Sequence, residues 1–246
     1  MAAPVTLTEA KLSALRQIGV TRLSLGVENF SDHILAEAGR YMMDFSCPIV
    51  AETWTSAEAS ALTAITAADL VLKGEPVAYA LCRPPGHHAT ADRSMGFCLL
   101  NNVAITAAAL ADRGERVLIV DFDAHHGNGT QDIFLADPRV LYVSFHEWPL
   151  YPGTGRHDEI GVGDGVGTTL NVPLPAGATG DHYLAGLDRV VAPVAAAFAP
   201  DWVLLSAGFD AHRADPLTGL GLSAGDYPPI VDRILAMAPP GRGITF

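Results

Sequence analysis

Short apolar segments alternate with longer, alanine-rich segments along most of this chain. The apolar segments lie at residues 77–82, 116–121, 140–145 and 202–206, and a further one begins near Gly243. Each has the length of a strand and is apolar at consecutive positions, which is typical of strands buried on both faces of a parallel sheet. The segments between them predict helices at residues 55–73, 102–113, 130–135, 181–198 and 224–237. Pro193 should break or bend the fourth helix, because proline removes a backbone hydrogen bond.

This alternation predicts an α/β fold in which an open parallel sheet forms the middle of three layers, with helices on both faces. The chain has 246 residues, of which 49% are hydrophobic and 17% are charged. That balance excludes an intrinsically disordered chain and allows a sizeable core. We therefore expect residues 1–246 to belong to a single domain.

Composition and charge limit the cellular compartments and the classes of binding partner that we expect for this protein. No apolar run approaches the ~18–20 residues of a membrane span, and no secretory signal opens the chain. The three cysteines are scattered, which favours the reducing cytoplasm over a disulfide-bonded protein. A net charge of −12 argues against direct binding to nucleic acid. It is compatible with a cationic substrate, although the charge alone can also serve solubility. Nothing in the sequence predicts the oligomeric state.

Polar side chains suited to metal binding or proton transfer follow four of the predicted strands. They lie in Gly86-His87-His88, in residues 121–129, in Ser144-Phe145-His146 and in residues 208–212. Ligands of open α/β sheets bind at the carboxyl ends of the strands. We therefore expect these four segments to meet in one crevice.

Three of these side chains predict a metal site. Asp121, Asp123 and His125 are spaced by two residues, which places them on one side of an extended chain. The expected ligands are Asp123, His125 and Asp210. They provide two carboxylates and an imidazole, a donor set suited to a catalytic Zn²⁺ or Fe²⁺ with an open coordination position. The alternatives are a polar turn at the strand end and, for Asp210, a helix N-cap.

The other candidate residues predict acid–base chemistry and an apolar channel. His87 and His88 follow the rigid Pro84-Pro85 and, beside a metal, would divide the roles of acid and base; the alternative is a solvated surface loop. The loops at Gly96-Phe97 and at Tyr151 can wall an apolar channel. Alternatively, both aromatic side chains belong to the core.

Taken together, these segments resemble, in order, the motifs of the zinc-dependent deacetylases, a family of histone deacetylases, acetylpolyamine amidohydrolases and acetoin-utilisation-type proteins. The matching segments are residues 83–89, 96–102, 121–130, 151–155 and 207–212, and the likeness runs from about Tyr41 to the C-terminus, with a class II-like character. The resemblance implies the arginase/deacetylase fold. It also implies hydrolysis of an acylated amine, such as acetyl-lysine or an acetylpolyamine.

The resemblance further implies a role for each matching residue. The metal ligands would be Asp123, His125 and Asp210, the acid–base pair His87 and His88, and the tunnel walls Gly96, Phe97 and Tyr151. A structural K⁺ or Na⁺ would bind Asp121, Ser144 and the backbone oxygens of Asp123, His125 and Phe145. Asp121 would also orient His87. Asn128 lies behind His88 where some members have Asp, and since an amide supports a charged imidazole less than a carboxylate does, His88 should be the less basic histidine.

The sequence departs from the family at both ends. The family's Glu-Gly-Gly-Tyr motif, with its catalytic tyrosine, should follow the strand near Gly243, but the printed chain ends at Phe246; a His-Pro-Glu-type start is not recognisable either. We therefore expect a chain truncated at both ends, with the C-terminal part of the fold missing and strand 202–206 lacking a sheet neighbour. A catalytically impaired binder of acylated amines stays open as an alternative. A two-metal ureohydrolase, which needs a second Asp-x-Asp pair where this chain has Asp210-Ala211-His212, is more remote.

Overall fold

The structure, a computed structural model, describes residues 46–47, 49 and 52–246 of the chain. In this part, six strands form a sheet in the order β1-β6-β5-β2-β3-β4, and all neighbouring strands run parallel. The strands are β1 (Val77–Tyr79), β2 (Val117–Asp121), β3 (Val140–Glu147), β4 (Thr169–Leu174), β5 (Trp202–Ser206) and β6 (Gly243–Thr245). The predicted open parallel sheet is thus confirmed.

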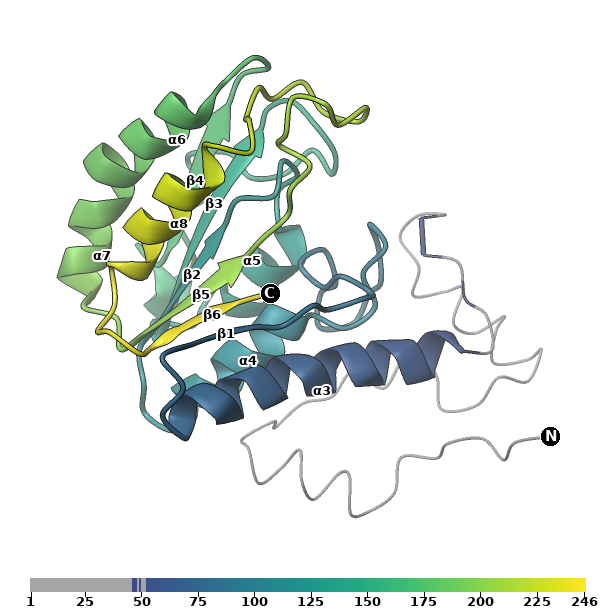
Figure 1. Cartoon of the computed structure of the whole chain (residues 1–246), viewed down its shortest axis with the longest axis vertical. Coiled ribbons are helices and arrows are strands. Elements are labelled where there is room, and N and C mark those ends of the chain that lie inside the picture. Colours follow the sequence, from purple (N-terminus) through teal and green to yellow (C-terminus); the bar gives the residue numbers. More distant parts are fainter. Residues whose placement is uncertain (1–45, 48, 50–51) are drawn as a thin grey trace.

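Helices cover both faces of the sheet (Figure 1). One face carries α3 (Thr53–Leu72), α4 (Asn102–Ala111) and α5 (Asn128–Phe134), and the other carries α6 (Gly180–Gly186), α7 (Ala192–Phe198) and α8 (Tyr227–Leu235). Consecutive residues of β2 serve different layers, because Ile119 packs in the core beside α4 whereas Leu118 and Val120 pack in the core beside α6 and α7. This is why the central strands are apolar at every position.

Local sequence explains where several helices begin. The side chain of Asn101 accepts a hydrogen bond from the backbone N–H of Ala104 and caps α4, whose sequence is rich in alanine. Pro228 and Pro229 lie in the first turn of α8, where a missing N–H leaves no helical bond unmade.

The helix predicted at residues 181–198 is interrupted, as expected near a proline. A π-helical turn (Leu187–Val191) joins α6 to α7, and Pro193 lies in the first turn of α7. Pro193 has no N–H to donate to the preceding turn. The wider π-helical turn before the proline accommodates the hydrogen bond that the proline cannot make.

The structure adds one strand to the predicted sheet and corrects one expectation about it. β4 was not predicted, because Asn171 and Pro173 make its sequence read as a loop; at the edge of a sheet a proline is tolerated. The expectation that strand 202–206 lacks a neighbour is wrong. β5 lies between β2 and β6, and Leu204 is paired with Ile119 on one side and Ile244 on the other.

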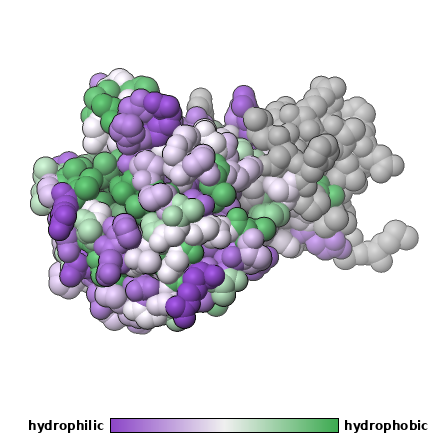
Figure 2. Space-filling model, turned by 90° about the horizontal axis from the view of Figure 1, so that it is seen from above, coloured by the Kyte–Doolittle hydropathy of each residue, from purple (hydrophilic) through white to green (hydrophobic). Residues whose placement is uncertain are grey.

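None of the helices in the described residues is both long and apolar enough to cross a bilayer. Seen from above, hydrophobic and hydrophilic residues are interspersed over the described part of the surface (Figure 2). At the carboxyl edge of the sheet, Asp121 of β2 is in register with Ser144 of β3 and Ser206 of β5. This edge is where ligands of parallel α/β sheets bind.

Candidate metal centre

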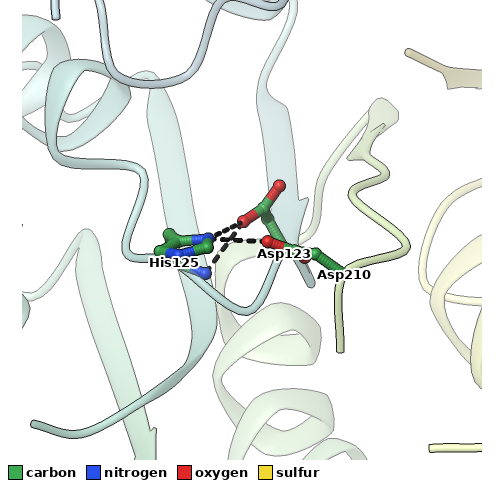
Figure 3. Close-up of side chains that lie close together, drawn as sticks. All are labelled: Asp123, His125 and Asp210. Atoms are coloured by element: carbon green, nitrogen blue, oxygen red, sulfur yellow. Dashed lines mark hydrogen bonds and ion pairs between the residues drawn. The ribbon is translucent and has the colours of Figure 1, made fainter. Parts of the chain in front are cut away.

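Asp123, His125 and Asp210 come together at the carboxyl edge of the sheet (Figure 3). β2 ends at Asp121, so a turn after the strand, rather than strand alternation, brings Asp123 and His125 side by side. The Nδ1 atom of His125 lies 3.2 Å from Oδ1 of Asp123 and 2.6 Å from Oδ2 of Asp210. The backbone N–H of Ala124 donates to Oδ1 of Asp210 at 2.8 Å. The carboxylate of Asp210 thus binds the segment after β2 instead of capping a helix of its own.

The donor set fits a divalent metal ion. One ligand atom from each of the three side chains lies within 4.8 Å of the others, and within the described residues this is the single group of three such side chains. Two carboxylates and one imidazole suit Zn²⁺ or Fe²⁺, and three protein ligands leave coordination positions for a substrate. The described residues offer no second such group for the two-metal alternative.

The charges on the two carboxylates act on His125. Burial disfavours its charged form, but hydrogen bonds to Asp123 and Asp210 and their negative charges raise the pKa of His125 to about 10. In the metal-free protein a proton on Nδ1 therefore compensates the two carboxylates. A metal ion that binds there takes the place of that proton.

The loop that carries the histidine pair is fixed at both ends. The carbonyl of Pro84 accepts hydrogen bonds from Ser60 Oγ of α3 at 2.8 Å and from Asn102 Nδ2 of α4 at 3.1 Å. The carbonyl of His87 accepts hydrogen bonds from the backbone N–H groups of Gly129 and Thr130, at 3.0 and 3.1 Å. The alternative of a solvated surface loop is therefore wrong: His87 is 8% exposed and its neighbour, His88, is 4% exposed.

Each imidazole of the pair has its own partner. His87 Nδ1 donates to Oδ2 of Asp121 at 3.0 Å, and its Nε2 lies 3.8 Å from Oδ2 of Asp123. His88 Nδ1 donates to Oδ1 of Asn128 at 2.7 Å. The ring centroids are 4.0 Å apart. The two Nε2 atoms are thus the ones without a carboxylate or amide acceptor at hydrogen-bonding distance.

The two pKa values move in opposite directions. Burial opposes the charged form of His87, but the negative charges of Asp123 and Asp121 outweigh it and raise its pKa to about 9. Burial and the charge of His87 lower the pKa of His88 to about 2, which the hydrogen bond to Asn128 only partly opposes. This is the order of basicity expected from Asn128 in place of a carboxylate.

The residues expected to hold a monovalent cation lie together, but the site remains a prediction. Asp121 and Ser144 are paired in neighbouring strands, and both are fully buried. Oδ1 of Asp121 accepts the backbone N–H of Asp123 at 3.2 Å, and Ser144 Oγ is hydrogen-bonded to Nδ1 of His146 at 2.9 Å. The first of these bonds uses Oδ1 of Asp121 and leaves Oδ2 to accept from His87.

Phe97 and Tyr151 are not core aromatics. Phe97 is 62% exposed and Tyr151 is 39% exposed. The Tyr151 ring stands edge-on to His88, with ring centroids 5.2 Å apart, and 6.2 Å from the ring of His125. Tyr151 therefore lies beside His88, and its role as a wall of a substrate channel stays a prediction.

A cavity of about 550 Å³ also reaches the site, and the residues that line it include His87, Asp123 and Phe209. Phe97 and Tyr151 do not line this cavity. Phe209 was not among the candidate residues, although its position directly before Asp210 is a signal that pointed to it.

A second residue that the sequence analysis missed is bonded to Thr154 of the loop that carries Tyr151. His126 is buried and lies 2.8 Å from Thr154 Oγ1 and 3.0 Å from Gln131 Oε1. Burial and the nearby His146 lower its pKa to about 3, so that the ring is neutral. Its place beside His125 in the sequence is the signal that could have identified it.

Gly96→Ala should displace His88 and lower kcat/KM by about 100-fold, the scale of a small misplacement of a reacting group. Gly96 has φ of +54°, and a Cβ atom there would overlap the His88 ring. Gly114→Ala is the matched control, because Gly114 has φ of +88° and nothing within 4 Å of a Cβ. Both variants carry the strain of a side chain at positive φ, and Gly96→Ala should lose more stability in thermal unfolding because of the overlap with His88. Equal losses of kcat/KM in the two variants would contradict the prediction.

The chain is similar to known proteins in both sequence and structure. A family model described as the histone deacetylase domain matches residues 15–244. A probable deacetylase from Archaeoglobus fulgidus is 46% identical over 199 residues, which cover 80% of this chain and 55% of that protein. An acetylpolyamine amidohydrolase from Burkholderia pseudomallei is 45% identical over 197 residues, covering 79% of this chain and 58% of that protein. The crystal structure of an acetylpolyamine aminohydrolase from Burkholderia pseudomallei superimposes with a TM-score of 0.79 at 34% identity, covering 99% of this chain and 77% of that one. This chain thus spans somewhat more than half the length of the two sequence relatives.

Proposed function

Because the chain belongs to the histone deacetylase family, we propose that it is a metal-dependent amidohydrolase that removes the acetyl group from an N-acetylated amine. The observation that carries the proposal is the meeting of the Asp123–His125–Asp210 group with the buried pair His87 and His88. A metal-binding group beside two imidazoles of unlike pKa is what hydrolysis of an unactivated amide requires.

Asp123, His125 and Asp210 would hold the ion, which when bound polarises an amide carbonyl and lowers the pKa of water. His88 is neutral, and because its Nδ1–H is used by Asn128, its Nε2 lone pair can take a proton from the attacking water. His87 keeps a proton on Nδ1 for Asp121 and can give one from Nε2 to the leaving amine. The pKa of His87 falls from about 9 once the charges of Asp123 and Asp210 are neutralised, which makes it a stronger acid.

Two observations support a cationic substrate. The chain has a net charge of −12 at neutral pH. A relative covered by 79% of this chain is named as an acetylpolyamine amidohydrolase. Tyr151, at the edge of the site, offers an apolar surface to an aliphatic arm that ends in the acetyl group. An acetylated polyamine and an acetyl-lysine side chain both have this chemistry.

A direct test compares acetate release from an N-acetylated polyamine, an acetyl-lysine peptide and an N-acetylated neutral amine. The zinc-loaded protein should act on the first two, with kcat/KM at least about tenfold above that for the neutral amine, because a charge-complementary site gains ~1.4 kcal/mol or more. Addition of a chelator should stop the reaction.

Three outcomes would count against the proposal in different ways. Tight binding of an acetylated amine without acetate release would favour the catalytically impaired binder instead. Release that continues in the chelator-treated, metal-free protein would contradict the metal-dependent mechanism. A preference for anionic acyl compounds would contradict the charge argument.

A further inference from the structure

The loop that carries Tyr151 is tied to the scaffold by polar side chains from elements far apart in the sequence. His126 follows β2, Gln131 belongs to α5, and His146 lies in β3. Glu159 belongs to the loop itself, eight residues after Tyr151. Both histidines are buried, His126 at 1% and His146 at 0% exposure. Buried polar groups of this kind are retained in a core only where they are hydrogen-bonded.

The hydrogen bonds form a continuous line from Glu159 to Thr154. Glu159 Oε2 lies 2.6 Å from Gln131 Nε2, and Gln131 Oε1 lies 3.0 Å from His126 Nε2. His126 Nδ1 lies 2.8 Å from Thr154 Oγ1. The same carboxylate accepts the backbone N–H groups of Gly155 and Arg156, at 3.3 and 3.1 Å. The loop is therefore fixed through both its side chains and its backbone.

The donors and acceptors along this chain of hydrogen bonds can be assigned from the Glu159 carboxylate. A carboxylate only accepts hydrogen bonds, so the amide nitrogen of Gln131 must face Glu159. Its Oε1 then accepts from His126 Nε2–H and also from Asn171 Nδ2, at 2.7 Å. With the proton on Nε2, Nδ1 of His126 accepts the hydroxyl of Thr154. One carboxylate thus determines the orientation of an amide, an imidazole and a hydroxyl.

The loop also packs directly on the two buried imidazoles. Gly155 has φ of +93°, and a Cβ atom there would lie 2.6 Å from both Cγ of His126 and Nε2 of His146. The Gly155 carbonyl accepts a hydrogen bond from Nε2 of His146 at 2.9 Å. Four residues earlier, the ring of Tyr151 stands edge-on to His88. The anchor at Gly155 is therefore close enough to fix where Tyr151 lies.

We propose that Glu159, Gln131 and His126 are positioning residues that hold Tyr151 against the catalytic centre and so determine how tightly the arm of the acetylated amine binds. The expected effect on substrate binding rests on the proposed function. The expected effect on the position of Tyr151 does not. The ring of Tyr151 lies edge-on to His88, whereas the three positioning residues act only through the loop.

The test replaces the amide of this hydrogen-bonded chain by a carboxylate and then exchanges the amide and the carboxylate. Gln131→Glu places two carboxylates face to face and should push the loop away from α5. Gln131→Glu combined with Glu159→Gln exchanges the two groups, so that an amide again meets a carboxylate, and the carboxylate of Gln131→Glu still accepts from His126 and Asn171. The amide oxygen of Glu159→Gln still accepts the Arg156 N–H, and only the longer bond from the Gly155 N–H is lost. Asp158→Asn is the control, because Asp158 is in the same loop but pairs only with the exposed Arg156.

Two readouts separate positioning from general stability. The ring signal of Tyr151 in the NMR spectrum, assigned by its loss in Tyr151→Phe, should shift in Gln131→Glu and return in the double variant, with or without activity. In the zinc-loaded protein, KM for an N-acetylated amine should rise roughly tenfold in Gln131→Glu, with kcat and zinc content unchanged, as for loss of a pocket contact.

The outcomes are decisive for the positioning role. An unmoved Tyr151 signal in Gln131→Glu, or a double variant whose signal lies no closer to that of the wild-type protein, would overturn the proposal. An equal shift in Asp158→Asn would do the same, since the effect would then belong to charge in the loop. A Tyr151 signal that shifts and returns in a protein without hydrolytic activity would support the positioning role and count against the proposed function.

Discussion

Asp210→Ala should abolish tight binding of a divalent metal ion and, with it, all acetate release. Oδ2 of Asp210 lies 2.6 Å from His125 Nδ1, and its other oxygen accepts the N–H of Ala124, so its removal takes away both a ligand and an anchor of the neighbouring ligand. Mutation of a residue that only supports a metal ligand typically lowers the affinity for the metal by about 10–100-fold. Loss of a ligand itself should therefore lower that affinity by more than about 100-fold. Calorimetric titration with Zn²⁺ measures this affinity.

The same titration has a pH dependence of known sign. The pKa of His125 is raised to about 10 in the metal-free protein, so at neutral pH a proton must leave Nδ1 before a metal can bind. The wild-type protein should release about one proton per metal ion, and affinity should fall roughly tenfold for each unit by which pH is lowered.

Asp232→Ala is the control for this prediction, because Asp232 lies on the exposed surface of α8. It should bind zinc as the wild-type protein does. Unchanged affinity in Asp210→Ala, or two tightly bound ions per wild-type chain, would show that the metal centre is not the one assigned to Asp123, His125 and Asp210.

His88→Ala should keep one zinc per chain and lose about 10²–10⁴-fold in kcat, the range typical of general acid–base catalysis. The reason is that Nε2 of the neutral His88 is the group that can accept the proton of water, whereas Asn128 occupies only Nδ1. Steady-state kinetics with the preferred acetylated amine, together with metal analysis, measure both quantities.

His157→Ala provides the matched control, because His157 is an exposed histidine in the loop after Tyr151. It should change kcat by less than about twofold, as surface substitutions generally do. If His88→Ala lost zinc to the same extent as Asp210→Ala, His88 would be a ligand rather than a base. If kcat were unchanged, the proton would be taken by another group.

The elements of the fold follow from the sequence where hydrophobicity is continuous. β2 and β5 are apolar at every position but the last, and the first four positions of β3 are apolar too; such runs have few alternatives in an α/β chain. β4 was missed because Asn171 and Pro173 interrupt the pattern, and only pairing with β3 makes it a strand. The neighbour of β5 could not be foreseen either, since strand order depends on packing between distant segments.

The sequence by itself determined which functional groups this protein has: the carboxylates and imidazole of the candidate metal centre, and the paired histidines in a rigid loop. Only the tertiary structure decided what these groups do to one another. Asp210 and His125 are 85 residues apart in the chain, yet they share a hydrogen bond at 2.6 Å. His87 and His88 are adjacent and chemically identical, yet their pKa values are about 9 and about 2. The reason is that a pKa depends on burial and on nearby charges, and folding alone places Asp121 and Asp123 beside one ring and an uncharged amide beside the other.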